Sequence, residues 1–154
     1  LFIKFSMFAI VKFKIMTKVL ILCSGNSCRS QMAEGWLKYF SQNTIVYSAG
    51  THPEGVNKHA IHVMKAAGVD ISNNTSNNVN DYIDIDLDYV ITVCDNAKER
   101  CPYLPDTAKK QHHSFEDPAN ATGTDVEQLL VYRRVRDQIK YYMKEFSRKN
   151  LNNS

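Results

Sequence analysis

The chain has 154 residues, of which 44% are hydrophobic and 23% are charged, and its formal net charge at pH 7 is +3. These values are typical of one globular domain with a proper core, and they exclude a wholly disordered, collagen-like or coiled-coil chain. No apolar run reaches the roughly 20 residues of a membrane-spanning helix. The small net charge does not indicate a nucleic-acid partner.

Residues 1–15 are apolar with three lysines, and the chain starts with Leu rather than Met. A signal peptide would place its charges ahead of the apolar stretch and end in small residues, which this segment does not do. We interpret Met16 as the natural start and residues 1–15 as an upstream extension outside the fold. A membrane-surface segment and an extra strand are the alternatives. The domain then covers residues 16–149, followed by a polar tail at 150–154.

After this leader, short apolar runs alternate with helical patterns. The expected elements are strands at 19–22, 44–48, 89–93 and 111–115, and helices at 29–40, 57–67 and 124–146. Residues 69–85 are rich in Asn and Asp and predict a loop with short helical turns. Strands that alternate with helices predict an α/β fold, here a single-domain three-layer sandwich with a four-stranded parallel sheet flanked by helices. Such sheets bind ligands beyond the carboxyl ends of their strands.

The loop between the first strand and the first helix carries the strongest chemical pattern, because Cys23 and Arg29 stand in C-x5-R spacing. Small residues between them let successive backbone N–H groups face inward, and the helix that follows adds a favourable field for an oxyanion. Arg29 can bind two oxygens at once. The same field stabilises a thiolate at Cys23, which would be the nucleophile. The expected oxyanion loop consists of Ser24, Gly25, Asn26, Ser27, Cys28, Arg29 and Ser30. A buried structural cysteine in a tight turn is the alternative.

Two other cysteine patterns in the sequence allow more than one interpretation. Cys94 and Arg100 also fit C-x5-R, but that segment has no glycine and carries two carboxylates, which would repel an oxyanion. Cys28 could be a resolving thiol for Cys23, although we favour a small core-facing residue at the helix start.

Asp117 is the candidate general acid for the leaving group. It lies in Glu116-Asp117-Pro118, and the proline keeps the preceding residue extended, which can aim the carboxyl group across a pocket. Asp-Pro pairs are also common in turns, so a purely structural role remains the alternative.

Cys94 and Cys101 form a second pair near the end of the third strand. Helical residues seven apart are separated by roughly 10 Å along the axis. A disulfide needs Cα atoms about 4.4–6.8 Å apart, so a bridge requires this segment to unwind. This spacing predicts a redox-active disulfide with a built-in conformational change. The alternatives are two unrelated thiols and a zinc site with His112 and His113, whose spacing is unusual for zinc.

Several motifs, in order along the chain, resemble the thioredoxin-coupled arsenate reductases, which share the fold of the low-molecular-weight protein tyrosine phosphatases. The motifs are LCSGNSCRSQMAEGW, VYSAG, DIS, ITVC-x6-CP-x2-P, HHSFEDPA and RRVRDQI. The resemblance runs from Lys18 to about Phe146. His113 and Ser114 depart from it, since they replace an expected aromatic–Gly pair before the acid loop.

The resemblance implies a relay. Arsenate, with phosphate or sulfate as analogues, binds the loop, Cys23 attacks arsenic and Asp117 protonates the departing oxygen. Cys94 then attacks Cys23, Cys101 attacks Cys94, and thioredoxin reduces the resulting Cys94–Cys101 bridge. Asn26 and Ser30 would hold the loop.

The resemblance implies no tightly bound cofactor. Some relatives bind a potassium ion, and the positions that match are Asn26, Glu34, Ser48 and Asp70. Alternatively, Glu34 and Asp70 are simply solvated or paired.

A phosphatase that uses Cys23, Arg29 and Asp117 is the second hypothesis, and an oxyanion or redox sensor is the third. The phosphatase is less favoured because residues 119–122 offer no aromatic ring to stack on phosphotyrosine. Reactive thiols and a reducible bridge indicate a reducing compartment, the cytoplasm. We expect a monomer with no nucleic-acid or membrane partner.

Overall fold

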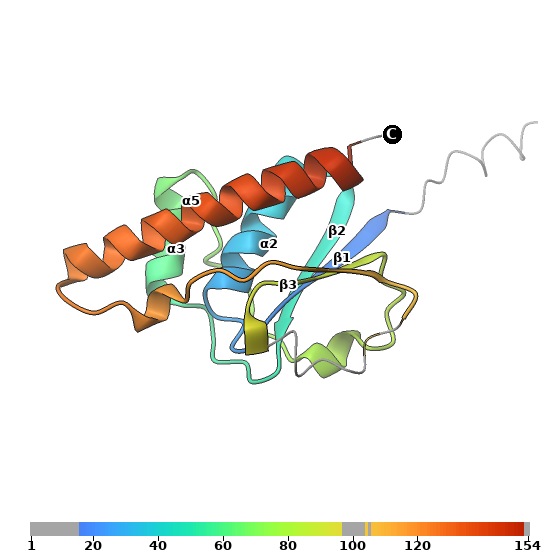
Figure 1. The fold of residues 1–154 in the computed structure, drawn as a ribbon, viewed down its shortest axis with the longest axis horizontal. Helices are drawn as coiled ribbons and strands as arrows, with labels where there is room; N and C mark the ends of the chain where they lie inside the picture. Colours follow the sequence, from blue (N-terminus) through green and yellow to red (C-terminus); the bar gives the residue numbers. More distant parts are fainter. Residues whose placement is uncertain (1–15, 97–103, 105, 153–154) are drawn as a thin grey trace, which may run out of the picture.

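The computed structural model describes residues 16–96, 104 and 106–152. The predictions for the leader, Arg100 and Cys101 therefore lie outside the described residues. The elements, shown in Figure 1, are β1 (Thr17–Cys23), α2 (Arg29–Phe40), β2 (Thr44–Gly50), α3 (Lys58–Ala66), η1 (Val79–Tyr82), β3 (Tyr89–Thr92), β4 (Lys109–His112), η2 (Pro118–Asn120) and α5 (Asp125–Asn150).

The sheet has the strand order β2-β1-β3-β4, and every pair is parallel. β1 lies in the interior of the sheet, where residues 19–23 are buried on both faces. This burial explains why the strand reads as a continuous apolar run rather than an alternating one. The predicted four-stranded parallel sheet with helices is confirmed.

The alternation of side chains along β2 shows what covers each face of the sheet. Ser48 faces α2 and accepts a hydrogen bond from Asn26 at 2.9 Å. Tyr47 points to the opposite face, where its ring centroid lies 5.1 Å from that of Tyr82 in η1. On the α2 side, α5 crosses and contacts both α2 and α3 (Figure 1). The sheet therefore lies between the helices and the η1 segment.

Two elements, β4 and α5, differ from their predicted bounds by three or more residues at one end. β4 begins at Lys109 rather than at residue 111, because it is an edge strand whose first residues are exposed and carry no apolar signal. α5 runs to Asn150, four residues beyond the predicted end. Its last turn is polar and is held by local bonds, including Asn150 Nδ2 to the Phe146 carbonyl (3.1 Å). Within the described part of the chain, no helix is both long and apolar enough to span a membrane.

The register of the sheet brings the chemically important residues to one edge. Cys23 pairs with Gly50, and Leu22 pairs with Thr92, which lies two residues before Cys94. Since the carboxyl ends of parallel strands meet at the same edge, the first loop and the first cysteine of the second pair become neighbours.

Thr124 begins α5 with a capping box, in which Glu127 N–H donates to Thr124 Oγ1 and Thr124 N–H donates to the Glu127 carboxylate. We expect Thr124→Ala to lower the free energy of unfolding by about 1 kcal/mol and the melting temperature by about 2–4 °C. Thr122→Ala, at an exposed site two residues earlier, is the matched control for thermal denaturation. Equal melting temperatures for the two variants would contradict the capping role.

Candidate active site

The carbonyl groups of the Cys23 loop all bond to residues outside the loop. The backbone bonds run from His52 N to Ser24 O (2.9 Å), from Glu54 N to Gly25 O (2.9 Å) and from Asn57 N to Ser27 O (3.0 Å). In a planar trans peptide the carbonyl and the following N–H point in opposite directions. Outward carbonyls therefore turn the loop N–H groups inward, which is the arrangement of an anion nest.

Gly50 makes room for this loop at the end of β2. A Cβ atom at this position would lie 2.8 Å from the Asn26 backbone nitrogen and closer still to the Ser24 carbonyl oxygen. Both atoms are backbone, so they cannot move aside without distorting the loop. The loop and β2 can approach this closely only because the residue is glycine.

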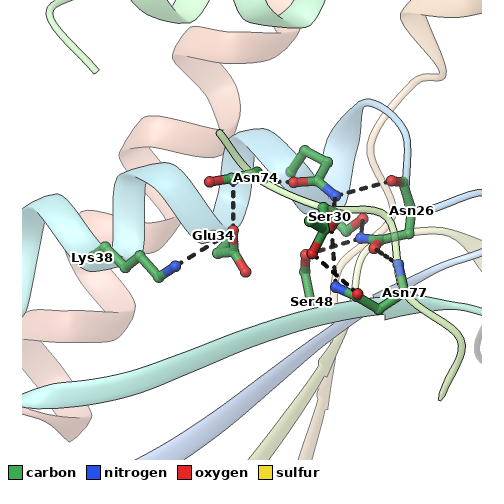
Figure 2. A network of polar contacts seen from close by, with 9 residues as sticks. Asn26, Ser30, Glu34, Lys38, Ser48, Asn74 and Asn77 are labelled. Atoms are coloured by element: carbon green, nitrogen blue, oxygen red, sulfur yellow. Dashed lines mark hydrogen bonds and ion pairs between the residues drawn. The ribbon is translucent and has the colours of Figure 1, made fainter. Parts of the chain in front are cut away.

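Asn26 is the centre of the polar contacts beneath the loop (Figure 2). It is fully buried and has a left-handed backbone, with φ of 45°. Its Nδ2 donates to Ser30 Oγ (2.8 Å) and to Ser48 Oγ (2.9 Å), and its Oδ1 accepts from the Asn77 backbone N–H (2.9 Å). Every hydrogen-bonding group of this side chain is thus used to hold the loop.

Sequence reasoning missed the outer partners of this loop, namely His52, Glu54, Asn57, Gln31 and the segment around Asn77. The first three contribute backbone N–H groups, which leave no side-chain signal in a sequence. Gln31 could have been noticed, because a polar residue on the apolar side of an amphipathic helix needs a buried partner.

Arg29, the first residue of α2, connects the loop to the acid segment. Its Nη1 donates to the Phe115 carbonyl (3.0 Å), and its Nη2 lies 3.3 Å from Asp117 Oδ2. Its Nε is buried and has no hydrogen-bond partner among the described residues. The guanidinium is therefore fixed in orientation while one of its donors remains available.

Asp117 caps a turn, as one of the two interpretations made from the sequence expects. Its Oδ1 accepts from the Ala119 N–H at 3.0 Å, so it caps the short helix η2. Its other oxygen faces Arg29, and a third of the side chain is exposed. The cap sets the orientation of a carboxyl group at the edge of the loop, which leaves a role as general acid open.

Cys23 and Cys94 lie next to each other at this edge, and both are buried. The side-chain hydrogen bond with Cys94 and the burial raise the pKa of Cys23, whereas Arg29 and the Ser24 N–H lower it. Cys94 Sγ also lies 3.5 Å from Ser24 Oγ. The pKa of Cys23 is raised overall, which is opposite to the sequence expectation. The hydrogen bond with Cys94 and the burial outweigh the effects of Arg29 and the Ser24 N–H.

Cys28 occupies the N-cap position of α2 but makes no capping bond with its side chain. It packs toward α5, with Sγ 3.8 Å from Tyr132 Oη. Burial raises the pKa of this thiol. The placement matches the core-facing interpretation favoured from the sequence.

The residues considered for zinc do not converge. His112 bonds Thr92 Oγ1 (2.6 Å) and Asp95 Oδ1 (3.0 Å), while the ring of His113 lies 4.7 Å from that of Tyr142 on α5. His113 also contacts Phe115, so it serves as an aromatic residue at the position where the family pattern has one. No group of three or more His, Cys, Asp or Glu side chains suited to a metal occurs in the described ranges.

Of the four positions considered for potassium, Asn26, Glu34 and Ser48 lie together beneath the loop, because Ser48 bonds both Asn26 and Glu34. Asn26 and Ser48 are bonded to each other, and Glu34 Oε2 is engaged by Asn74 Nδ2 (2.6 Å) and Lys38 Nζ (3.6 Å). Asp70 is exposed and bonds the Ser72 N–H instead. The Glu34 carboxylate thus contacts an amide and an ammonium group of the chain itself, and potassium at these positions stays a prediction.

Comparisons with known proteins agree with this geometry. The family model for low molecular weight phosphotyrosine protein phosphatases matches residues 18–154. The arsenate reductase of Bacillus subtilis (strain 168) is 46% identical over 130 residues, which cover 84% of this chain and 94% of that protein.

Two solved structures carry the same fold. One is described as an arsenate reductase in an oxidized state, with a TM-score of 0.76, 32% identity and coverage of 87% of this chain and 98% of that one. Another, described as being in the phosphate binding state, has a TM-score of 0.71 with the same identity and coverage. This chain therefore belongs to the low molecular weight phosphotyrosine protein phosphatase family and, within it, to the arsenate reductases.

Proposed function

We propose that this chain reduces arsenate to arsenite by a cysteine relay, in which Cys23 is the nucleophile and Cys94 and Cys101 are successive resolving thiols. The observation that carries the proposal is the contact between the buried side chains of Cys23 and Cys94. A phosphatase needs one thiol at this edge, whereas a reductase needs a second thiol that can reach the first. The names of the similar proteins support the same activity.

Arsenate would bind inside the loop, where the inward N–H groups and Arg29 face its oxygens. The buried Nε of Arg29 supports this, because an oxyanion would supply the acceptor that it lacks among the described residues. Phosphate and sulfate have the same tetrahedral shape and would compete. The solved relative in a phosphate binding state is consistent with such competition.

In the first step the Cys23 thiolate attacks arsenic, an S–As bond forms and one As–O bond breaks. Asp117 donates a proton to the departing oxygen, which leaves as water. The position of Asp117 beside Arg29 supports this role, since Arg29 would contact the same oxyanion.

In the second step the Cys94 thiolate attacks the Cys23 sulfur. An S–S bond forms and the S–As bond breaks with its electron pair going to arsenic, so As(V) becomes As(III) and arsenite leaves. The Ser24 hydroxyl, 3.5 Å from Cys94 Sγ, can donate a hydrogen bond to the attacking thiolate.

In the third step the Cys101 thiolate attacks Cys94, which forms the Cys94–Cys101 disulfide and releases Cys23 as a thiolate. Thioredoxin, whose potential is about −270 mV, would reduce this bridge by thiol–disulfide exchange. The relay needs a reducing compartment, so we place the protein in the cytoplasm.

Replacing Cys101 tests the relay. We expect the wild-type protein to show continuous arsenate-dependent NADPH oxidation with thioredoxin and thioredoxin reductase. Cys101→Ser should release at most one arsenite per chain, because the Cys23–Cys94 bridge would not be passed on. Cys23-dependent hydrolysis of p-nitrophenyl phosphate with no arsenate turnover in either protein would instead support a phosphatase.

Replacing Asp117 tests the proton donor. Asp117→Asn should slow arsenite release in a single turnover by about 10²–10⁴-fold. Glu116→Gln is the matched control, because that neighbouring carboxylate pairs with Arg134 on the surface. If both variants react at the wild-type rate, another group protonates the leaving oxygen.

Replacing Cys94 tests the pKa of the nucleophile. Because the Cys94 side chain raises the pKa of Cys23, Cys94→Ala should shift the alkylation of Cys23 by iodoacetamide to lower pH. The rate at a fixed pH below the pKa should then increase. Cys28→Ala should leave this pH profile in place, and an unchanged profile in Cys94→Ala would contradict the contact.

A further inference from the structure

We propose that Asn74 is a positioning residue for the Cys23 loop, which it connects to the ion pair of Glu34 and Lys38 through the buried side chain of Gln31. The proposal rests on the oxyanion-binding role proposed above for this loop. It gives the segment before η1 a part in the reaction, although none of its side chains reaches the reacting atoms.

Gln31 forms the inner link. It is fully buried in α2, and its Nε2 donates to the carbonyl groups of Asn26 (3.0 Å) and Thr75 (3.0 Å). Its Oε1 accepts from Asn74 Nδ2 at 3.1 Å. Because both donors and the acceptor of the amide are engaged, the side chain has one favoured orientation.

Asn74 and Glu34 form the outer link (Figure 2). Asn74 Nδ2 donates to Glu34 Oε2 at 2.6 Å as well as to Gln31. Lys38 Nζ lies 3.6 Å from the same Glu34 oxygen, one turn along α2. Burial raises the pKa of Glu34 and Lys38 lowers it, so the ammonium group supports the charged carboxylate that accepts from Asn74.

The link ends at the strained peptide of the loop. Asn26 has a φ of 45°, a left-handed conformation that residues other than glycine adopt rarely and that the surroundings must hold. Its carbonyl accepts from Gln31 and from Ser76 Oγ (3.0 Å). With this carbonyl held outward, the N–H of Ser27 on the same planar peptide is held toward the anion. If the bonds of Asn74 were lost, the Gln31 side chain could rotate and release the Asn26 carbonyl. The Ser27 N–H would then no longer be held toward the anion.

Asn74→Asp tests this connection with little change in size. The new carboxylate would face Glu34 Oε2, and at pH 8 we expect phosphate to bind at least about tenfold more weakly than to the wild-type protein. At pH 5.5 a proton shared between the two carboxyl groups restores a hydrogen bond. The ratio of the variant and wild-type dissociation constants should then fall toward one. Taking the ratio at each pH cancels the titration of phosphate itself.

Asn73→Asp is the matched control, because it adds the same charge one residue away on an exposed side chain. Isothermal titration calorimetry with inorganic phosphate should give it a ratio near one at both pH values. Asn74→Ala provides a second variant if Asn74→Asp does not fold, and it should weaken binding without the recovery at low pH.

The outcomes separate this inference from the proposed function. Tight phosphate binding by both Asn74 variants would overturn the positioning role and leave the oxyanion loop intact. Equal weakening in Asn73→Asp and Asn74→Asp would also overturn it, because the effect would be one of charge alone. A wild-type protein that binds no phosphate would overturn the proposed loop function itself.

Discussion

The active-site edge depends on one constraint, the outward orientation of the carbonyl groups in the Cys23 loop. A peptide that turned its carbonyl inward would place a partial negative charge where an oxyanion must bind. The fold prevents this by supplying donors from outside the loop, from residues 52–57 on one side and from Ser76 on the other. Gly50 lets β2 come close enough to support the loop. The anion-binding property is therefore a property of the surrounding backbone as much as of the loop.

The same edge combines two demands that oppose each other. The loop N–H groups, Arg29 and the start of α2 create a positive field, which favours a thiolate at Cys23. The side-chain hydrogen bond with Cys94 and the burial of the site disfavour that thiolate and raise the pKa of Cys23. The proposed relay needs both thiols together, so a raised Cys23 pKa would follow directly from bringing the second thiol into reach. A phosphatase with the same loop but no second thiol would not have this effect on the pKa of its nucleophile.

The structure clarifies the positions of Asp117 and His113, two residues that the sequence left open. Asp117 was open to interpretation as an acid or as a turn residue, and its carboxylate both caps η2 and pairs with Arg29. In the proposed reaction this cap would orient the carboxyl group for proton transfer. His113 departs from the family pattern in identity, yet its ring packs against both Phe115 and Tyr142 as an aromatic ring would.

The sequence by itself determined the order of the strands and helices, because buried parallel strands and amphipathic helices differ in their apolar period. It also located the loop, because Gly25, the small polar residues and Arg29 follow one strand and begin one helix. The contact between Cys23 and Cys94, 71 positions apart, could be anticipated only as a shared sheet edge. Its consequence for the pKa of Cys23 was decided by the tertiary structure, since it depends on distance and burial. The contacts of Gln31, Asn74 and Asn77 beneath the loop were also decided there. Such contacts join polar residues from different segments, and the apolar period of a sequence does not show which polar residues will come into contact.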